Sequence, residues 1–381
     1  MDKLPPLYLD YAATTPLDER VLAAMRPYQE NVFGNPSSQH SFGRAARAAV
    51  DAARDMVADL LGARSSEIIF TSGGTEANNL AIKGVAHAAV VRGNHLITTA
   101  FEHHAVLAPC KTLARTGFLI TYLQPDTNGS ISAAQVANHI TPATTLVSVM
   151  LANNEIGTIQ PVHEIAEICH AHGVHLHTDA VQAAGEFALN VDEFGVDLLS
   201  LSGHKIYGPK GVGVLYIRSG VRLQPQMDGG GQELERRAGT ESVAAIVGFA
   251  EALRLAHDPS EIIRQRILRD LLIDGLLALP GTMLNGGRAP RLSNNVNVSF
   301  AGIPGETMLL ALDLSGIAIS TGAACSAGAV EASHVLLALG RSPAVAAEAI
   351  RLSLGRATTE SDIIRTIKTV KQIAGRLRKT A

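Results

Sequence analysis

Short apolar runs alternate with longer amphipathic segments between about residues 66 and 217. Helices are expected to begin at Thr75 and at His103, between the first runs of this series. The runs predict seven strands, with the sequences EIIF, HLITT, FLITYL, TLVSVM, VHLHTDA, VDLLSLS and GVLYI. This rhythm is typical of βαβ units, so we expect an α/β fold with a mostly parallel seven-stranded sheet and helices on both faces. Ligands bind at the carboxyl ends of the strands in such sheets, and functional residues are expected there.

The pattern changes near residue 258. A helix is expected from Ser242 to His257, and the run Asp258-Pro259-Ser260 ends it before a second helix starts near Glu261. The segments that follow predict short strands and helices in turn, with the sequences GTMLN, NNVNVSF, GETMLLALDL and GIAIS. We therefore predict a large domain of residues 16–257 and a smaller α+β domain formed by residues 1–15 and 258–381.

Composition narrows the class of protein. Hydrophobic types make up 46% of the 381 residues, enough to bury a substantial core. Lys and Arg number 32 against 35 Asp and Glu, so no basic track for nucleic acid is expected. No apolar run reaches the roughly 18 to 20 residues that a bilayer requires, and the first residues lack a signal-peptide core, which predicts a cytoplasmic protein.

Cysteine and histidine spacing gives no sign of a metal site. The three cysteines lack CxxC spacing, which argues against both a disulfide framework and a cysteine-built zinc site. His170, His172, His175 and His177 span a helix end and a strand start, so their side chains are expected to point in different directions. No metal is therefore expected.

Lys205 lies in SLSGHKIYGPKG, directly after a buried strand. An amine is costly to bury there unless it is neutralised or used covalently, so Lys205 is a candidate for Schiff-base formation. The run VHLHTDA ends at Asp179, and a lysine and a carboxylate at consecutive strand ends suit pyridoxal 5′-phosphate, whose ring nitrogen must stay protonated. Upstream, TSGGTEANN places Gly73, Gly74 and Thr75 at a helix start, where free N–H groups and the helix dipole favour a phosphate.

Taken together, these motifs resemble those of the cysteine desulfurases, which are fold-type-I pyridoxal phosphate enzymes. The nitrogen-fixation and general iron–sulfur types are the most similar. The resemblance runs nearly end to end, through LDYAATTP, FGNPSS, TSGGTEANNLAIKG, EHHAVL, NNEIGTIQP, TDAVQ, SLSGHKIYGPKG, RAGTES, STGAACSAG and RLSLGR. It implies that the large domain binds the cofactor and that the small domain carries a catalytic cysteine.

The resemblance also implies roles for individual residues. Lys205 would hold the cofactor, Asp179 would pair with its ring nitrogen, and Gln182 would meet its phenolic oxygen. His103 would stack on the ring and assist proton transfers. The remaining cofactor contacts would come from Gly74, Thr75, Asn154, Ser202 and His204, and from Thr240 of a second subunit in a homodimer. Asn35 and Arg351 would bind the substrate carboxylate.

Cys325 matches the sulfur-accepting nucleophile of the family. Its neighbours in STGAACSAG are small residues, which predicts a mobile loop. Its thiolate is expected to attack the sulfur of L-cysteine, giving L-alanine and a persulfide that passes to an acceptor such as an iron–sulfur scaffold protein. No acid or base lies between Ser315 and Val330, so His103 is the expected general base.

Several alternatives stay open. Only 30 residues follow Arg351, whereas the general iron–sulfur type continues into a tail that docks its scaffold, so docking of that kind is not expected. A role in tRNA thiolation or DNA sulfur modification is equally compatible with the chain. A selenocysteine lyase has similar motifs. A transaminase or kynureninase-like enzyme of the same fold would leave Cys325 without a use, and a silent scaffold would have no need of the complete site.

Overall fold

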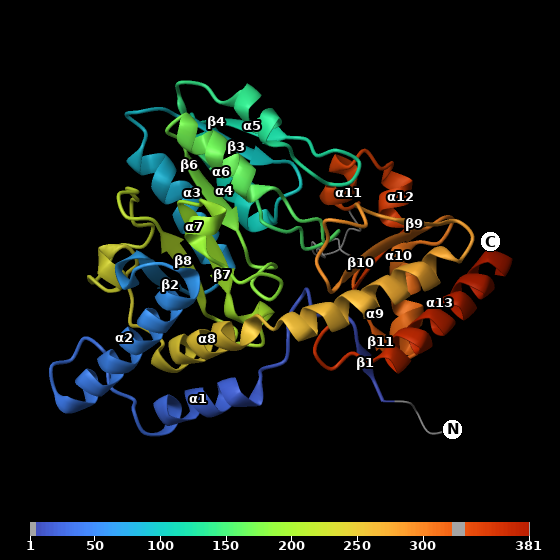
Figure 1. The fold of residues 1–381 in the computed structure, drawn as a ribbon, viewed down its shortest axis with the longest axis horizontal. Coiled ribbons are helices and arrows are strands. Elements are labelled where there is room, and N and C mark those ends of the chain that lie inside the picture. The colour runs from blue at the N-terminus through green and yellow to red at the C-terminus, as the bar shows by residue number, and fades with distance from the viewer. Residues whose placement is uncertain (1–4, 322–331, 381) are drawn as a thin grey trace.

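The computed structural model describes residues 5–321 and 332–380. Its main element is a seven-stranded sheet with the strand order β2-β8-β7-β6-β5-β3-β4 (Figure 1). The strands are β2 (Ile68–Thr71), β3 (His95–Thr99), β4 (Leu119–Leu123), β5 (Thr144–Ser148), β6 (His175–Asp179), β7 (Leu198–Ser202) and β8 (Gly213–Ile217). Strand β8 is antiparallel to both of its neighbours, and the other pairs are parallel. The prediction of a mostly parallel sheet built from these seven runs is confirmed.

The strands read as continuous apolar runs because both faces of the sheet are covered. On one face, Ile69 and Leu215 pack with α3 (Gly74–Ala88) and α4 (His104–Arg115). On the other face, Ile68 and Val214 pack into the largest core cluster, to which three helices contribute more apolar residues than the others do. These helices are α2 (Ser41–Leu61), α6 (Val162–Ala171) and α8 (Val243–Ala256). The alternation of side chains along each strand thus separates two cores.

The remaining elements around this sheet are shorter. The helix α1 (Glu19–Glu30) packs against α8, and α5 (Ala133–His139) packs against α6. The other pieces are α7 (Val191–Phe194) and the 3₁₀ turns η1 (Ser65–Glu67), η2 (Gly203–Lys205) and η3 (Glu233–Glu235). Among the described residues, no helix is long and apolar enough to cross a membrane.

The C-terminal part forms a second core around a three-stranded antiparallel sheet, in which β10 (Asn295–Phe300) lies between β9 (Thr282–Leu284) and β12 (Ala349–Ser353). The N-terminal strand β1 (Leu7–Tyr8) pairs with β11 (Ile317–Ala318) and adds Leu7 and Leu9 to this core. These contacts support the assignment of residues 1–15 to the small domain, whose boundaries stay a prediction. The helices here are α9 (Pro259–Leu277), α10 (Gly305–Leu314), α11 (His334–Ala338), α12 (Pro343–Ala347) and α13 (Glu360–Thr380).

The expected break near residue 258 is present. Helix α8 ends at Ala256, and Asp258 caps α9 by accepting hydrogen bonds from the N–H groups of Ser260 and Glu261. Pro259 occupies the first turn of α9, where its missing N–H is not needed. The two helices follow one another from the large sheet to the second core, as Figure 1 shows.

A buried ion pair holds the segment that leads to RAGTES. Arg54 of α2 donates two hydrogen bonds to the Glu233 carboxylate, at 2.8 and 2.7 Å, and Glu233 also accepts from the N–H of Phe70 at 2.8 Å. Glu233, Leu234 and Glu235 all have left-handed backbone angles, with φ of 45°, 57° and 61°. Each left-handed residue raises the conformational free energy of the folded chain by about 1–2 kcal/mol, and the buried ion pair offsets this strain.

We expect Glu233→Gln to destabilise the fold by about 3–5 kcal/mol, because it leaves the Arg54 guanidinium buried without its counter-charge. The loss is measured from the shift of the urea unfolding midpoint. The control is Asp274→Asn, which removes an exposed partner of Arg288 and should cost below about 1 kcal/mol. Equal losses in the two variants would contradict this role of the buried pair.

Candidate active site

A cavity of about 470 Å³ lies where the carboxyl ends of β6 and β7 meet the start of α3, the start of α4 and strand β12. Its volume suits a small-molecule ligand. The predicted site residues that line it are Gly74, Thr75, His103, Asn154, Asp179, Gln182, Ser202, His204, Lys205 and Arg351. Residues from widely separated parts of the chain therefore come together as the strand-end rule predicts.

Asp179 is the last residue of β6 and is held by two donors. The side chain of Asn78, on α3, donates to Oδ2 at 2.7 Å, and the N–H of Val181 donates to Oδ1 at 3.0 Å. Both donors fix the orientation of the carboxylate. Asn78 is 1% exposed, and its Oδ1 has no hydrogen-bond partner. The pair gives the cavity a fixed negative group.

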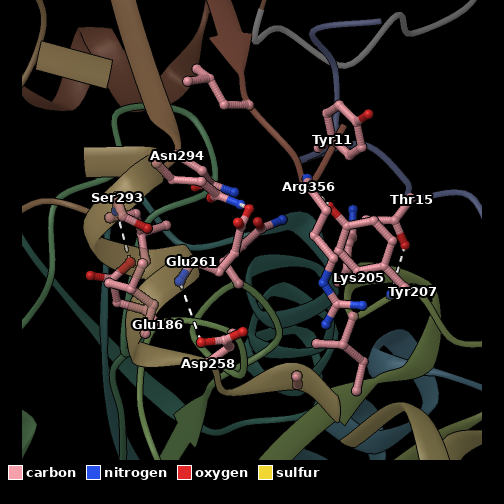
Figure 2. Close-up of a pocket in the computed structure, with 18 of the residues that line it drawn as sticks. Tyr11, Thr15, Glu186, Lys205, Tyr207, Asp258, Glu261, Ser293, Asn294 and Arg356 are labelled. Carbon is pink, nitrogen blue, oxygen red and sulfur yellow. Dashed lines mark hydrogen bonds between the residues drawn. The ribbon is translucent and has the colours of Figure 1, made fainter. Parts of the chain in front are cut away.

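The amine of Lys205 is directed at the N-terminal segment. Its Nζ donates to the carbonyl oxygens of Ala12 and Ala13, both at 2.6 Å. Gln182 also donates to the Ala12 carbonyl, at 3.0 Å. Burial, followed by the nearby Arg351 charge, lowers the pKa of Lys205 to about 8. A smaller cavity of about 70 Å³ touches Lys205 together with Tyr207 and Glu186 (Figure 2).

The start of α3 forms the end of the cavity that suits an anion. Gly74 opens the helix, and a Cβ at this position would come within 2.7 Å of the Val181 side chain, so only glycine leaves this approach free. An adjoining cavity of about 340 Å³ is lined by the same turn, by Ser202 and His204, and by Lys210. Free N–H groups, hydroxyls and a lysine thus face one space.

His103 caps α4 with its own ring. Its Nδ1 accepts a hydrogen bond from the N–H of Ala105 at 3.0 Å. Desolvation is the main cause that lowers the pKa of His103, with Lys205 acting in the same direction and Asp179 against it. A neutral ring that accepts at Nδ1 carries its proton on Nε2, so Nε2 is a donor in this arrangement. This differs from the expectation of a general base.

Arg351 projects from β12, and its guanidinium group makes only some of the hydrogen bonds that it can donate. It donates to the Asp10 carboxylate at 2.7 Å and to the Asn154 carbonyl at 3.1 Å. Its side chain is 6% exposed, and its Nε has no partner. The orientation of this arginine is therefore fixed by Asp10 while a buried N–H remains available.

Among the predicted site residues that the structure describes, two do not line the cavity. Asn35 is exposed in the loop before α2, where its side chain accepts from the N–H of Ser37. Thr240 is exposed and follows Arg237, which pairs with Glu76 of α3 at 2.8 Å. Cys325, the predicted nucleophile, lies outside the described residues.

Sequence reasoning missed Asn78, Asp10 and a buried acid, Glu155. The Glu155 carboxylate lines the cavity and accepts from the Ser333 hydroxyl at 2.5 Å, and burial raises its pKa to about 7. Asn78 had a usable signal, because it falls at helical spacing with the apolar residues at 81, 82 and 85. Asp10 had none, since its partner Arg351 lies 341 residues away.

A family model described as aminotransferase class-V matches residues 7–365. The chain is 50% identical to cysteine desulfurase IscS of Dictyoglomus turgidum over 375 residues, which cover 98% of this chain and 95% of that protein. It is 49% identical to cysteine desulfurase IscS of Methanosarcina thermophila over 374 residues, covering 98% and 93%.

Solved structures show the same likeness. A NifS-like protein superimposes with a TM-score of 0.91 at 38% identity, over 97% of this chain and 99% of that one. A structure of SspA in complex with cysteine superimposes with a TM-score of 0.82 at 40% identity, over 91% of this chain and 98% of that one.

We expect the Lys205 amine of the cofactor-free protein to titrate near pH 8, because burial and the Arg351 charge disfavour its protonated form. Acetylation of Lys205, followed by mass spectrometry across a pH series, measures this midpoint. The urea-unfolded chain serves as the control and should titrate near pH ~10.4. Coincident midpoints in the folded and unfolded chain would contradict the assignment.

Proposed function

The chain belongs to the class-V aminotransferase family and is a cysteine desulfurase that uses pyridoxal 5′-phosphate, and on this premise we propose which residues carry the reaction. The main cavity binds the cofactor and L-cysteine, and Cys325 takes the sulfur. The observation that carries this proposal is the meeting of Lys205, Asp179 and the N-terminus of α3 in one cavity.

The residues fit the cofactor. Asp179, fixed by Asn78, is placed to keep a pyridine nitrogen protonated. The N–H groups at the start of α3, with Thr75, Ser202 and His204, provide donors for a phosphate, and Gly74 lines the same space. When bound to Lys205, the cofactor acts as an electron sink for the bonds around the substrate α-carbon.

Arg351 is the proposed ligand of the substrate carboxylate. A buried arginine N–H without a partner is unfavourable by about 1–3 kcal/mol, and a carboxylate would satisfy it with a charge-assisted bond. Asp10 and the Asn154 carbonyl hold the guanidinium in place without using all of its donors. Asn35 lies outside the cavity of its own chain, and its role in binding the substrate carboxylate stays a prediction.

Lys205 is the proposed base at the substrate α-carbon, since a pKa of about 8 leaves part of its amine unprotonated near neutral pH. His103, with its proton on Nε2, donates rather than accepts. The Cys325 thiolate attacks the substrate sulfur, so an S–S bond forms as the C–S bond breaks. The products are L-alanine and a persulfide on Cys325, with no net oxidation.

The wider setting is part of the proposal. We place the protein in the cytoplasm as a homodimer and expect the persulfide sulfur to pass to an acceptor such as an iron–sulfur scaffold protein. Two features support the dimer. Thr240 lies outside the cavity of its own chain, and Phe33 and Phe42, whose ring centres lie 5.5 Å apart, are 74% and 54% exposed.

Cys325→Ser should still bind the cofactor and L-cysteine but form no persulfide, and alanine formation should fall at least about 100-fold, because serine is a poor nucleophile toward sulfur. Alanine and protein-bound sulfur are measured after incubation with L-cysteine. Cys169→Ala, in the buried part of α6, is the control and should keep its activity. Unchanged sulfur release in Cys325→Ser would overturn the proposed nucleophile.

Thr240→Val should weaken cofactor binding about 10- to 100-fold, because it removes a hydrogen bond to a charged phosphate. Mixing Lys205→Ala subunits with Thr240→Val subunits tests the dimer. If Thr240 serves the partner's cavity, each mixed dimer contains one complete site, and tight cofactor binding returns to that site. No recovery after subunit exchange would show that Thr240 does not act across subunits.

A further inference from the structure

Two residues just beyond the cavity contact each other. Arg356 follows Arg351 of β12 by five residues, and Tyr207 follows Lys205 by two. The Arg356 guanidinium lies 4.3 Å from the centre of the Tyr207 ring, and the backbone N–H of Arg356 donates to the Tyr207 hydroxyl at 2.8 Å. Figure 2 shows both side chains beside Lys205. The contact joins the segment of the proposed carboxylate ligand to the segment of the proposed cofactor lysine.

Tyr207 has a backbone that needs this support. Its φ is +63°, a left-handed conformation that bulky residues rarely adopt. Its N–H donates to the Thr15 hydroxyl at 2.8 Å, and its carbonyl accepts from the N–H of Asp18 at 3.0 Å. Burial raises the pKa of Tyr207 to about 12, so its hydroxyl stays neutral and able to accept. The turn that presents Lys205 is thus held from outside the cavity.

The Arg356 side chain is fixed over the ring by two further bonds. It pairs with the Asp18 carboxylate at 2.9 Å and donates to the Leu255 carbonyl at 2.6 Å. Asp18 is also bound by Arg20, whose hydrogen bond is the main cause that lowers the pKa of Asp18 to about 2. Asp18 therefore stays ionised, and Arg356 and Arg20 share one carboxylate.

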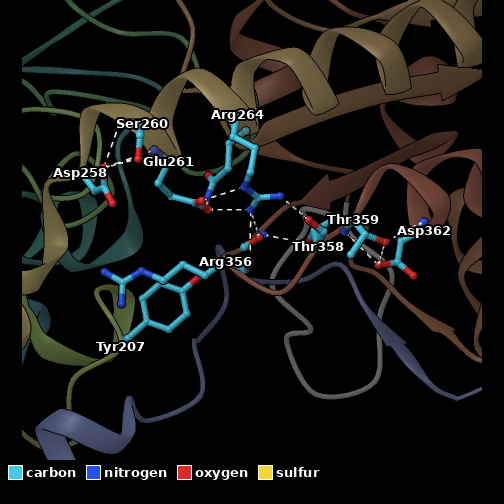
Figure 3. A network of polar contacts seen from close by, with 11 residues as sticks. Tyr207, Asp258, Ser260, Glu261, Arg264, Arg356, Thr358, Thr359 and Asp362 are labelled. Carbon is cyan, nitrogen blue, oxygen red and sulfur yellow. Dashed lines mark hydrogen bonds and ion pairs between the residues drawn. The ribbon is translucent and has the colours of Figure 1, made fainter.

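The backbone around Arg356 is held from the opposite side by α9. Arg264 donates to the carbonyl oxygens of Gly355 and Arg356, both at 3.2 Å, and of Thr358 at 2.5 Å. Two hydrogen bonds to Glu261, at 2.8 and 2.7 Å, fix the Arg264 guanidinium (Figure 3). Helix α9 therefore fixes the position of the segment after β12. Through its contacts with Tyr207, Arg356 links that position to the turn after Lys205.

We propose that Arg356 is a positioning residue, which acts through Tyr207 to fix the Lys205 amine relative to Arg351. The inference rests on the proposed function, because it takes Lys205 as the cofactor lysine. Without the Arg356–Tyr207 contact, the turn after Lys205 can change its conformation, and the Lys205 amine becomes more accessible to water. The charged and titratable groups that face this amine are Asp10, His103, Asp179, His204 and Arg351.

The test compares Arg356→Gln with Arg20→Gln. Both variants remove a positive charge that pairs with the Asp18 carboxylate, but the Tyr207 contacts come from Arg356 and not from Arg20. The readout is the pH midpoint of Lys205 acetylation in the cofactor-free protein. Arg356→Gln should raise this midpoint by about one unit, because the amine becomes better solvated, and Arg20→Gln should leave it unchanged. In the loaded enzyme, kcat should fall at least about tenfold for Arg356→Gln alone. Equal midpoints in the two variants would overturn the proposal.

Two further variants separate positioning from general loss of structure. Tyr207→Phe keeps the ring but removes the hydroxyl that accepts from Arg356, so a smaller shift of the midpoint in the same direction is expected, with an unchanged thermal unfolding temperature. Arg356→Lys keeps the charge opposite Asp18 but not the flat guanidinium. If Arg356→Lys raises the midpoint of Lys205 acetylation as much as Arg356→Gln does, the stacking contact is supported. If Arg356→Lys keeps the midpoint of the unchanged protein, the role of the stacking contact is overturned.

A different result would overturn the proposed function instead. If Lys205→Ala still bound pyridoxal phosphate covalently, Lys205 would not be the cofactor lysine, whatever the Arg356 variants showed. If Lys205→Ala lost the cofactor while Arg356→Gln and Arg20→Gln behaved alike, the proposed function would stand and this inference alone would fail.

Discussion

The hydrogen bonds from the Lys205 amine to the carbonyls of Ala12 and Ala13 are the interaction on which the site depends. An amine held away from water needs acceptors, and here they come from the N-terminal segment rather than from the sheet. That segment is itself fixed elsewhere, because the N–H of Ala12 donates to Ser353 of β12 and β1 pairs with β11. The lysine at the large sheet is therefore positioned by contacts with β11 and β12 of the second core.

Much of this arrangement could be predicted because the large sheet is covered on both faces. Strands buried on both sides must be apolar throughout, so their runs stand out in the sequence and their carboxyl ends indicate the cavity. Lys205 and Asp179 were found in this way, from residue type and position at strand ends. The break at Asp258 was equally visible, since an N-cap residue followed by proline indicates a helix start through neighbouring residues alone.

The rest could not be predicted because it depends on distant contacts. Strand β12 was not among the predicted strands, because its residues are buried beside β10 and pairing with that strand decides their conformation. Asp10 and Arg351 meet only in the folded chain. Long-range partners, rather than residue types, decide these functions.

The charge distribution of the cavity follows from the same partners. Burial raises the pKa of Glu102 to about 8, so this acid, directly before His103, is mostly neutral near pH 7. Asp10 pairs with the Arg351 guanidinium, whose Nε has no hydrogen-bond partner. The adjoining cavity at the start of α3 has one carboxylate among its lining residues, that of Glu76, which is paired with Arg237. The cavity thus offers hydrogen-bond donors at the start of α3 and at the Arg351 guanidinium, which come from different parts of the chain, while Asp179 supplies a carboxylate at the end of β6.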